Sequence, residues 1–211
     1  MNYNFVKLNI KAEKMIVDYK NKELTQKYQL MAQTIIPRPI AWVVTQNNGV
    51  LNIAPFSYFM GLSSDPATMM ISIGHKSDGT QKDTLKNLRE TKKCTICMVD
   101  EKLLEKMHFS SKEVDASVSE ADEFGIDTEC VVDGFPPMVK GTPSAFFCEF
   151  YQEIDLKGSK TIPLVVEIKE QFISDEIIID KERITIDYEP VARVGKSYAL
   201  LGKKITPPTI L

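Results

Sequence analysis

The most constraining feature of this sequence is a two-residue alternation of apolar and charged side chains over residues 146–157 and 164–169. In the first stretch, Phe146, Cys148 and Phe150 fall on one face of an extended strand, and charged side chains occupy the other. This alternation is typical of antiparallel sheet that packs on a core with one face and meets water with the other. It predicts a fold built mainly of β-strands.

A second extended region covers residues 35–60. The prolines of Pro37-Arg38-Pro39 push their preceding residues out of the helical region, and residues 40–45 are rich in β-branched and aromatic side chains. Asn47-Asn48-Gly49 is a hairpin-turn signal, because Asn and Gly tolerate a positive φ. A returning strand is expected from about Val50.

Further elements complete the outline. Residues 68–74 and 93–99 read as strands, residues 84–90 as a short helix, and residues 101–124 as two short helices. The sum is a β-dominated chain with short helices at its periphery, which favours a Greek-key barrel.

Length and composition bound the organisation of the chain. A chain of 211 residues can bury a sizeable core, and β-barrels of this length fold as single domains. We expect one domain over residues 31–211. Residues 1–30 are polar and lysine-rich, and we interpret them as an N-terminal arm or a short leading strand.

Charge and cysteine content exclude several classes. The 26 basic and 29 acidic residues leave a net charge of −3, which disfavours a nucleic-acid partner. No stretch approaches the roughly 18 apolar residues of a membrane span, and the first residues do not resemble a secretory signal. Four cysteines in such a chain are expected to be reduced thiols. We therefore expect a cytoplasmic protein without a membrane partner.

Familiar catalytic and metal motifs fail on spacing. Cys94 and Cys97 lie in one expected strand, where residues three apart point to opposite faces, so no shared metal or disulfide is expected. Gly195-Lys196-Ser197 lacks the first glycine of a phosphate-binding loop, because Pro190 stands there. No nucleophile-elbow motif supports a hydrolase, and no cluster has metal-ligand spacing. We therefore expect no metal, and hydrolysis by side chains alone has little support, although a Ser-His-Asp triad stays open at this point.

A different signal is the tripeptide Lys82-Asp83-Thr84 at the expected start of a helix. A helix N-terminus presents unpaired N–H groups and the positive end of the dipole, which suits a phosphate. Lys82 adds a charge and Thr84 a hydroxyl donor, whereas Asp83 would repel a phosphate and is expected to cap the helix. Ordinary helix capping is the alternative interpretation of this tripeptide. Trp42 and the aromatic side chains of residues 56–59 can likewise be interpreted as core residues.

Several motifs occur together in the order found in one protein family. They are Pro37-Arg38-Pro39-Ile40-Ala41-Trp42-Val43, Asn52-x-Ala54-Pro55-Phe56-Ser57-Tyr58-Phe59, Ser63-Ser64-Asp65-Pro66, Ile71-Ser72-Ile73-Gly74, Lys82-Asp83-Thr84-Leu85-x-Asn87 and Glu90-Thr91. On these motifs the sequence resembles the flavin reductase-like family with the FMN-binding split barrel, flavoredoxin-type proteins in particular. The likeness continues more weakly through Ser119–Phe124 and Arg193-Val194-Gly195-x-x-Tyr198.

The resemblance implies a six-stranded antiparallel Greek-key split barrel, a homodimer, and FMN bound near the dimer interface. It implies that the flavin ring and ribityl chain are surrounded by Arg38, Thr45, Ala54, Pro55, Phe56, Ser57 and Tyr58. It places Ser72, Lys82 and Thr84 at the phosphate, with Asp83 between the last two. His75-Lys76 departs from the family pattern of glycine with arginine or lysine, so the phosphate contacts are expected to differ in detail.

The chemistry implied by the resemblance belongs to the cofactor. NADH or NADPH would bind transiently and pass hydride to flavin N5, since no dinucleotide fingerprint is present. The N–H groups of residues 56–58 would stabilise the negative charge that develops near flavin N1.

Two alternatives remain open. One is a flavoredoxin-like carrier that passes electrons between redox protein partners through bound FMN. The other is a split barrel with another ligand, either a deazaflavin or haem with His75 or His108 as its ligand.

Overall fold

The structure is a computed structural model that describes residues 14–209 of the chain. Its main sheet has seven strands in the order β2-β1-β5-β8-β9-β4-β3, and every neighbouring pair is antiparallel. The expected mainly β, antiparallel fold is confirmed. The strands are β1 (Ala41–Asn47), β2 (Val50–Phe56), β3 (Phe59–Ser64), β4 (Ala67–Ile73), β5 (Lys93–Cys97), β8 (Ser144–Glu153) and β9 (Ile162–Ile173).

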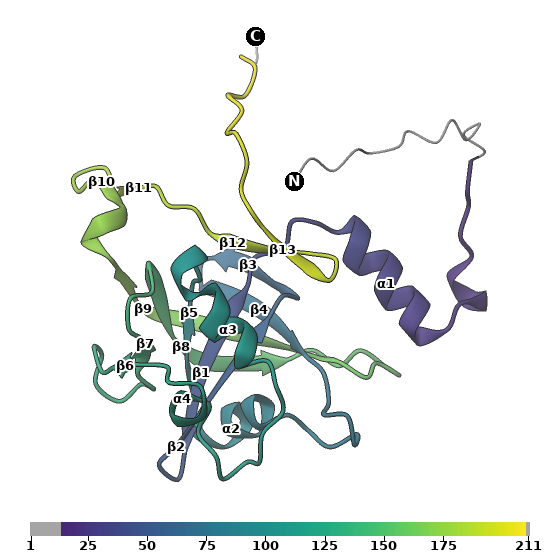
Figure 1. Cartoon of the computed structure of the whole chain (residues 1–211), viewed down its shortest axis with the longest axis horizontal. Helices are drawn as coiled ribbons and strands as arrows, with labels where there is room; N and C mark the ends of the chain where they lie inside the picture. Colours follow the sequence, from purple (N-terminus) through teal and green to yellow (C-terminus); the bar gives the residue numbers. More distant parts are fainter. Residues whose placement is uncertain (1–13, 210–211) are drawn as a thin grey trace.

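The two edge strands of this sheet, β2 and β3, are consecutive in the chain. Only Ser57 and Tyr58 separate them, and the Ser72 N–H of β4 donates to the Tyr58 carbonyl at 2.8 Å. The chain therefore passes directly from one edge of the sheet to the other, and the sheet curls into a barrel (Figure 1). Counted as one bent strand, β2 and β3 reconcile the seven observed strands with the six expected.

Strand β1 is buried on both of its faces. Trp42 and Val44 pack into one hydrophobic cluster, and Val43 packs into a second. Cys97 belongs to the first cluster and Cys94 to the second, which confirms that their side chains point to opposite faces. Two buried layers explain why β1 lacks alternation, and the first half of β8 (Ser144–Cys148) is also buried on both faces.

Short helices cover parts of the barrel. Helix α2 (Asp83–Thr91) lies against β1 and buries Leu85 and Leu88, as its spacing predicted. The expected helical region 101–124 holds η2 (Glu101–Leu103), α3 (Leu104–Phe109) and α4 (Glu120–Glu123). The remaining elements are β6 (Thr128–Glu129), β7 (Met138–Val139), η3 (Asp175–Ile177), β10 (Ile178–Asp180), β11 (Thr185–Ile186), β12 (Val191–Val194) and β13 (Ser197–Leu200).

The N-terminal region differs from one of its two interpretations. Residues 14–30 contain no strand; the chain forms η1 (Tyr19–Asn21) and then α1 (Leu24–Thr34). A capping box between Glu23 and Gln26 starts α1, and Ile36-Pro37 follows its end. The prediction of a leading strand is therefore wrong for these residues. The domain boundary expected at residue 31 falls inside α1. This helix lies to one side of the barrel (Figure 1). Residues 1–13 of the expected arm lie outside the described residues.

Within residues 14–209, no helix is long and apolar enough to cross a membrane.

Candidate functional site

Three adjoining cavities follow β2 from its hairpin end to its junction with β3. The hairpin cavity measures about 120 Å³ and reaches from Asn48 to Asn52. The anion cavity, of about 30 Å³, lies at Asn52 and Ala54. The aromatic cavity, of about 190 Å³, lies at residues 55–57. The first two share Asn52, and the last two share Ser111, so the three form one continuous β2 groove.

The anion cavity lies against the N-terminus of α2. Lys82 is the N-cap residue with an extended backbone, and no side chain caps this helix end. The N–H groups of Asp83 and Thr84 have no hydrogen-bond partner within residues 14–209. These two donors and the helix dipole favour an anion here.

Asp83 does not cap the helix, contrary to expectation. It occupies the first helical position, and its carboxylate lies 2.7 Å from the Lys76 ammonium. A carboxylate there is favoured by the helix dipole, and the lysine neutralises its charge. The hydrogen bond from Lys76 to Asp83 also raises the pKa of the Lys76 ammonium. Lys76 thus reduces the repulsion that Asp83 would exert on an anion.

Lysines and carboxylates line the anion cavity in equal numbers. Lys76, Lys82 and Lys112 line it together with Asp83, Glu113 and Glu120. Lys82 lies 3.8 Å from Glu113, in a half-exposed pair that water screens. Lys112 has no carboxylate within 4 Å in the described part of the chain. Two of the three lysines are therefore free or nearly free to meet an anion.

A buried polar network lies beneath the anion cavity. Asn52 Nδ2 donates to Thr84 Oγ1 at 2.8 Å and to Thr45 Oγ1 at 3.3 Å, and Asn87 Nδ2 donates to Thr45 Oγ1 at 3.1 Å. Thr84 accepts in this network, so its own hydroxyl hydrogen remains available for a ligand. Thr45 is fully buried and lines none of the three cavities.

Glu120 is a buried carboxylate between the anion and hairpin cavities. Its Oε2 accepts from the Ile53 N–H at 3.0 Å, which fixes α4 against β2. Burial raises the pKa of Glu120, and the Ile53 hydrogen bond opposes this shift. Protonation of Glu120 can therefore remove one negative charge from the lining of the anion cavity.

The aromatic cavity is assembled from distant parts of the chain. Pro55, Phe56 and Ser57 form its β2 side. The other lining residues come from α1, from the α3 region and from the β12–β13 hairpin: Tyr28, Met107, Ser111, Arg193 and Tyr198, with Ile40.

Ser57 and Arg193 bring a backbone donor and a cation to this aromatic cavity, and a second backbone donor follows in the chain at Tyr58. The N–H groups of Ser57 and Tyr58 have no partner within residues 14–209, because the β1–β2 pairing ends at Phe56. The Arg193 guanidinium carbon lies 4.8 Å from the Tyr198 ring centre. Arg193 forms no ion pair in the described part of the chain. The cavity therefore combines aromatic surface with donors for a developing negative charge.

Arg38 stabilises the chain around the groove instead of lining it. It is 5% exposed, and its Nη1 donates to the carbonyls of Ala32 at 2.7 Å and Ile35 at 2.8 Å, at the end of α1. Its guanidinium carbon lies 5.6 Å from the Tyr58 ring centre, and its Nε is buried without a partner. Tyr58 is not among the residues that line the aromatic cavity, but its ring contacts that of Tyr28, which does line it, edge-on.

The expected site residues thus fall into three groups. Ala54, Lys82, Asp83 and Thr84 meet in the anion cavity. Pro55, Phe56 and Ser57 meet in the aromatic cavity. Arg38, Thr45, Tyr58 and Ser72 line none of the three cavities.

Several lining residues were absent from the expected set. Asn52 and Asn87 are parts of the recognised motifs, and buried amides that need partners are a usable signal. Lys112 lies in the loop between α3 and α4, and Glu120 is the first residue of α4; no local pattern shows that either lies at this cavity. His75 contacts the Lys160 carbonyl and His108 the Tyr198 hydroxyl, and no group of three metal-ligating side chains occurs within residues 14–209.

Several known proteins are similar to this chain in sequence, in structure or in both. Residues 31–177 match the family model described as the flavin reductase like domain. An uncharacterised protein of Aquifex aeolicus is 31% identical over 81% of this chain and 87% of its own length. The crystal structure of 2-nitrobenzoate 2-nitroreductase from Pseudomonas fluorescens has a TM-score of 0.83 at 29% identity, covering 93% of this chain and 98% of that one. Nitrilotriacetate monooxygenase component B from Bacillus cereus has a TM-score of 0.84 at 23% identity, with coverage of 93% and 100%.

Proposed function

This chain belongs to the flavin reductase-like family, and from that premise we propose that it is an oxidoreductase that binds FMN in the β2 groove. When bound, the flavin supplies the redox chemistry, accepting hydride at N5 from NADH or NADPH. The chain's own residues bind, orient and stabilise charge.

The donor set of the groove fits such a cofactor. A phosphate requires hydrogen-bond donors and positive charge, and the anion cavity offers two unpaired N–H groups, the Thr84 hydroxyl and Lys82. A flat aromatic ring requires an apolar cleft with a few donors, and the aromatic cavity offers Phe56, Met107 and Tyr198. The uncapped α2 N-terminus, which opens onto a cavity where Lys82 and Lys112 are available to an anion, is the observation that carries the proposal.

We assign roles to residues along this groove. Lys82 and Thr84 hold the phosphate, and Ala54 lies beside the ribityl chain. The N–H groups of Ser57 and Tyr58 face the pyrimidine edge of the ring, where negative charge develops on reduction. Pro55 and Phe56 line the ring, and Pro55 itself has no N–H to donate.

Arg38, Thr45, Asp83 and Ser72 are proposed as positioning residues. Thr45 holds Asn52, which in turn orients the Thr84 hydroxyl. Ser72 and Arg38 fix Tyr58 by a backbone hydrogen bond and by stacking, respectively. Asp83 keeps Lys76 beside the anion cavity.

We also propose that the protein is a cytoplasmic homodimer. The outer side of β3 exposes Met60 and Leu62, each about half exposed, and α1 exposes Tyr28 and Met31. An apolar surface of this kind next to the aromatic cavity suits a second copy. All four cysteines are free thiols, as a reducing compartment favours.

The test is an absorbance spectrum of the purified protein, followed by anaerobic titration with NADH and NADPH. We expect a flavin spectrum that either nucleotide bleaches without another protein. A haem spectrum, or a flavin that only a protein donor reduces, would contradict the proposal. 2-Nitrobenzoate is a useful trial acceptor, since the relative at 29% identity is its nitroreductase.

A further inference from the structure

The aromatic cavity has one wall that can change its charge near neutral pH. Tyr198 of β13 lines this cavity, and its hydroxyl oxygen lies 3.0 Å from Nδ1 of His108, the penultimate residue of α3. We propose that His108 is a positioning residue that acts through Tyr198: its protonation frees the Tyr198 hydroxyl hydrogen to donate to the ring bound in the cavity. The inference rests on the proposed function, because it takes the flavin ring to lie there.

The pair reaches from the cavity wall to solvent. Met107 and Ser111, which lie on either side of His108 in the chain, line the aromatic cavity together with Tyr198. The Ser111 hydroxyl donates to the His108 carbonyl at 2.6 Å. The His108 and Tyr198 rings meet edge-on with 5.7 Å between their centres. His108 itself is exposed and lines none of the three cavities, so it can exchange protons with water.

The direction of the hydrogen bond between His108 and Tyr198 depends on the charge of the imidazole. A neutral imidazole with its proton on Nε2 accepts at Nδ1 from the tyrosine hydroxyl, which has a single hydrogen to donate. A protonated imidazole carries a hydrogen on both nitrogens, so Nδ1 donates to the tyrosine oxygen instead. The hydroxyl hydrogen is then free for a ligand in the cavity. Because an imidazole changes charge between about pH 5 and 8, both directions occur near neutral pH.

The ionisable groups that surround the pair from other elements keep a constant charge over this range. Arg193 of β12 lies 4.8 Å from the Tyr198 ring centre, and Tyr28 of α1 lines the cavity. Arginine and tyrosine titrate well above about pH 8. Strand β2, which α3 also contacts, carries no ionisable side chain. Glu101 and Lys102 of η2 line a separate cavity with residues 174–177 and 187–189.

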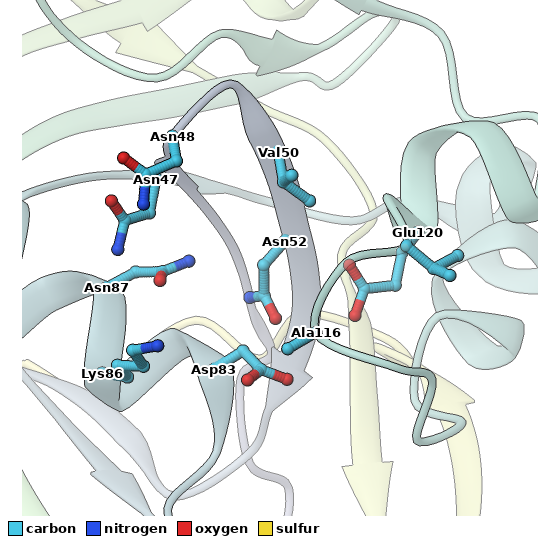
Figure 2. A pocket seen from close by; sticks show the side chains of 10 residues that line it. Asn47, Asn48, Val50, Asn52, Asp83, Lys86, Asn87, Ala116 and Glu120 are labelled. Carbon is cyan, nitrogen blue, oxygen red and sulfur yellow. The ribbon is translucent and has the colours of Figure 1, made fainter.

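Carboxylates are not paired with this imidazole. None lies within 4 Å of the His108 ring nitrogens in residues 14–209. Glu105 and Lys106 are the other ionisable residues of α3, and such groups titrate below and above the imidazole range, respectively. The carboxylates of Asp83 and Glu120 line the hairpin and anion cavities instead (Figure 2). His108 is therefore the group that changes the charge of this wall.

A new donor in the cavity favours the reduced ring over the oxidised ring, because negative charge develops on the ring on reduction and a hydrogen bond to a charged group is the stronger kind. Protonation of His108 should therefore raise the affinity for reduced FMN about tenfold relative to oxidised FMN. The reduction potential of the bound flavin rises accordingly, and this increment is lost as pH rises and the imidazole loses its proton.

The first measurement compares the reduction potential of bound FMN in the wild type and in Tyr198→Phe, which keeps the ring and loses the hydroxyl. At about pH 5.5 the wild-type potential should be higher by about 30 mV, which is a tenfold difference for two electrons. At about pH 8.5 the two potentials should agree. Comparing two proteins at one pH cancels the titration of FMN itself.

Two histidine variants complete this measurement. In a His108→Gln background, the effect of Tyr198→Phe on the potential should be the same at both pH values. His75→Gln is the matched control, since this exposed histidine contacts the Lys160 carbonyl and lines none of the three cavities. It should retain the wild-type dependence on pH. A Tyr198→Phe effect that does not change with pH in the wild-type background would overturn the inference.

The second measurement observes His108 directly by proton nuclear magnetic resonance. The chain has two histidines, so His75→Gln assigns both imidazole signals. By reciprocal linkage, reduction of the bound FMN at neutral pH should move the His108 signal towards its protonated position and leave the His75 signal in place. Tyr198→Phe should largely abolish this movement. A purified protein that takes up no FMN would remove the proposed function and this inference together, whereas FMN that is bound and reduced without a response of His108 would remove this inference alone.

Discussion

The two main cavities of the β2 groove are built in different ways. The anion cavity is centred on a compact motif, the start of α2 at residues 82–84 beside β2, although residues 110–114 and Glu120 add a wall from a remote segment. The aromatic cavity brings together Tyr28, Met107 and Tyr198 from three remote segments. Local chemistry thus defines where an anion binds, whereas tertiary packing defines what covers the ring. The predictions below separate these two contributions.

The largest effect is expected at the anion cavity. The double substitution Lys82→Ala and Thr84→Ala removes two charge-assisted hydrogen bonds, each worth roughly 1.5–3 kcal/mol. FMN should therefore bind at least about 100-fold more weakly, measured by flavin fluorescence. Lys140→Ala serves as the control for loss of charge. Unchanged FMN affinity in the double variant would remove the phosphate assignment.

A smaller and different effect is expected at the aromatic cavity. Arg193→Gln removes a cation that has no ion-pair partner in the described residues. Because the Arg193 guanidinium stabilises negative charge that develops on the flavin ring, this variant should reduce bound FMN about tenfold more slowly. Stopped-flow absorbance with excess NADH measures this rate. The FMN dissociation constant should change far less than in the anion-cavity variant. A loss of FMN affinity with an unchanged reduction rate would reverse the roles assigned to the two cavities.

The third prediction concerns Glu120, on the wall of the anion cavity. Burial raises the pKa of this carboxyl above its ordinary 4.5, so the folded protein retains a proton that the unfolded chain releases. The contribution of Glu120 protonation to the stability of the folded protein is present at low pH, and it is lost as pH rises through the raised pKa. A bound phosphate favours the protonated form further.

Glu120→Gln should therefore bind FMN more tightly than the wild type at neutral pH, by a few-fold, with no difference below the ordinary pKa of the carboxyl. The measurement is the ratio of the two dissociation constants against pH, which cancels titration of the phosphate itself. A ratio that stays constant across this range would show that Glu120 does not sense the ligand. The other charged groups of this cavity remain unchanged in both proteins; they are Lys76, Lys82, Asp83, Lys112 and Glu113.

The smallest effect is expected at the cysteines. Burial raises the pKa of Cys97 to about 12, so its thiol stays neutral and unreactive. Cys94→Ala and Cys97→Ala should leave the rate of flavin reduction unchanged per folded protein, although they reduce stability by small cavities. Loss of activity with the far-ultraviolet circular dichroism preserved would show a redox role for this pair.

The same contrast explains how far sequence reasoning extends. The β8 strand, the Asn47-Asn48-Gly49 turn and the Lys82-Asp83-Thr84 helix start were readable because each depends on neighbours in the chain. The alternation expected over 146–157 was only partly right, because β8 ends at Glu153 and Ser144–Cys148 is buried on both faces. The cap at α2 was wrong because Asp83 is held by Lys76, a pairing across a loop that local propensity does not encode. The positions of Arg38 and Thr45 depend on hydrogen bonds to α1 and α2, which only the folded chain shows.

The most direct test of the account is a comparison of FMN with riboflavin, which lacks only the phosphate. Titration of the apoprotein should show FMN binding at least about 100-fold more tightly, and Lys82→Ala should reduce that ratio while affecting riboflavin little. Equal affinities for the two flavins would contradict the central claim that the α2 N-terminus and Lys82 bind the phosphate.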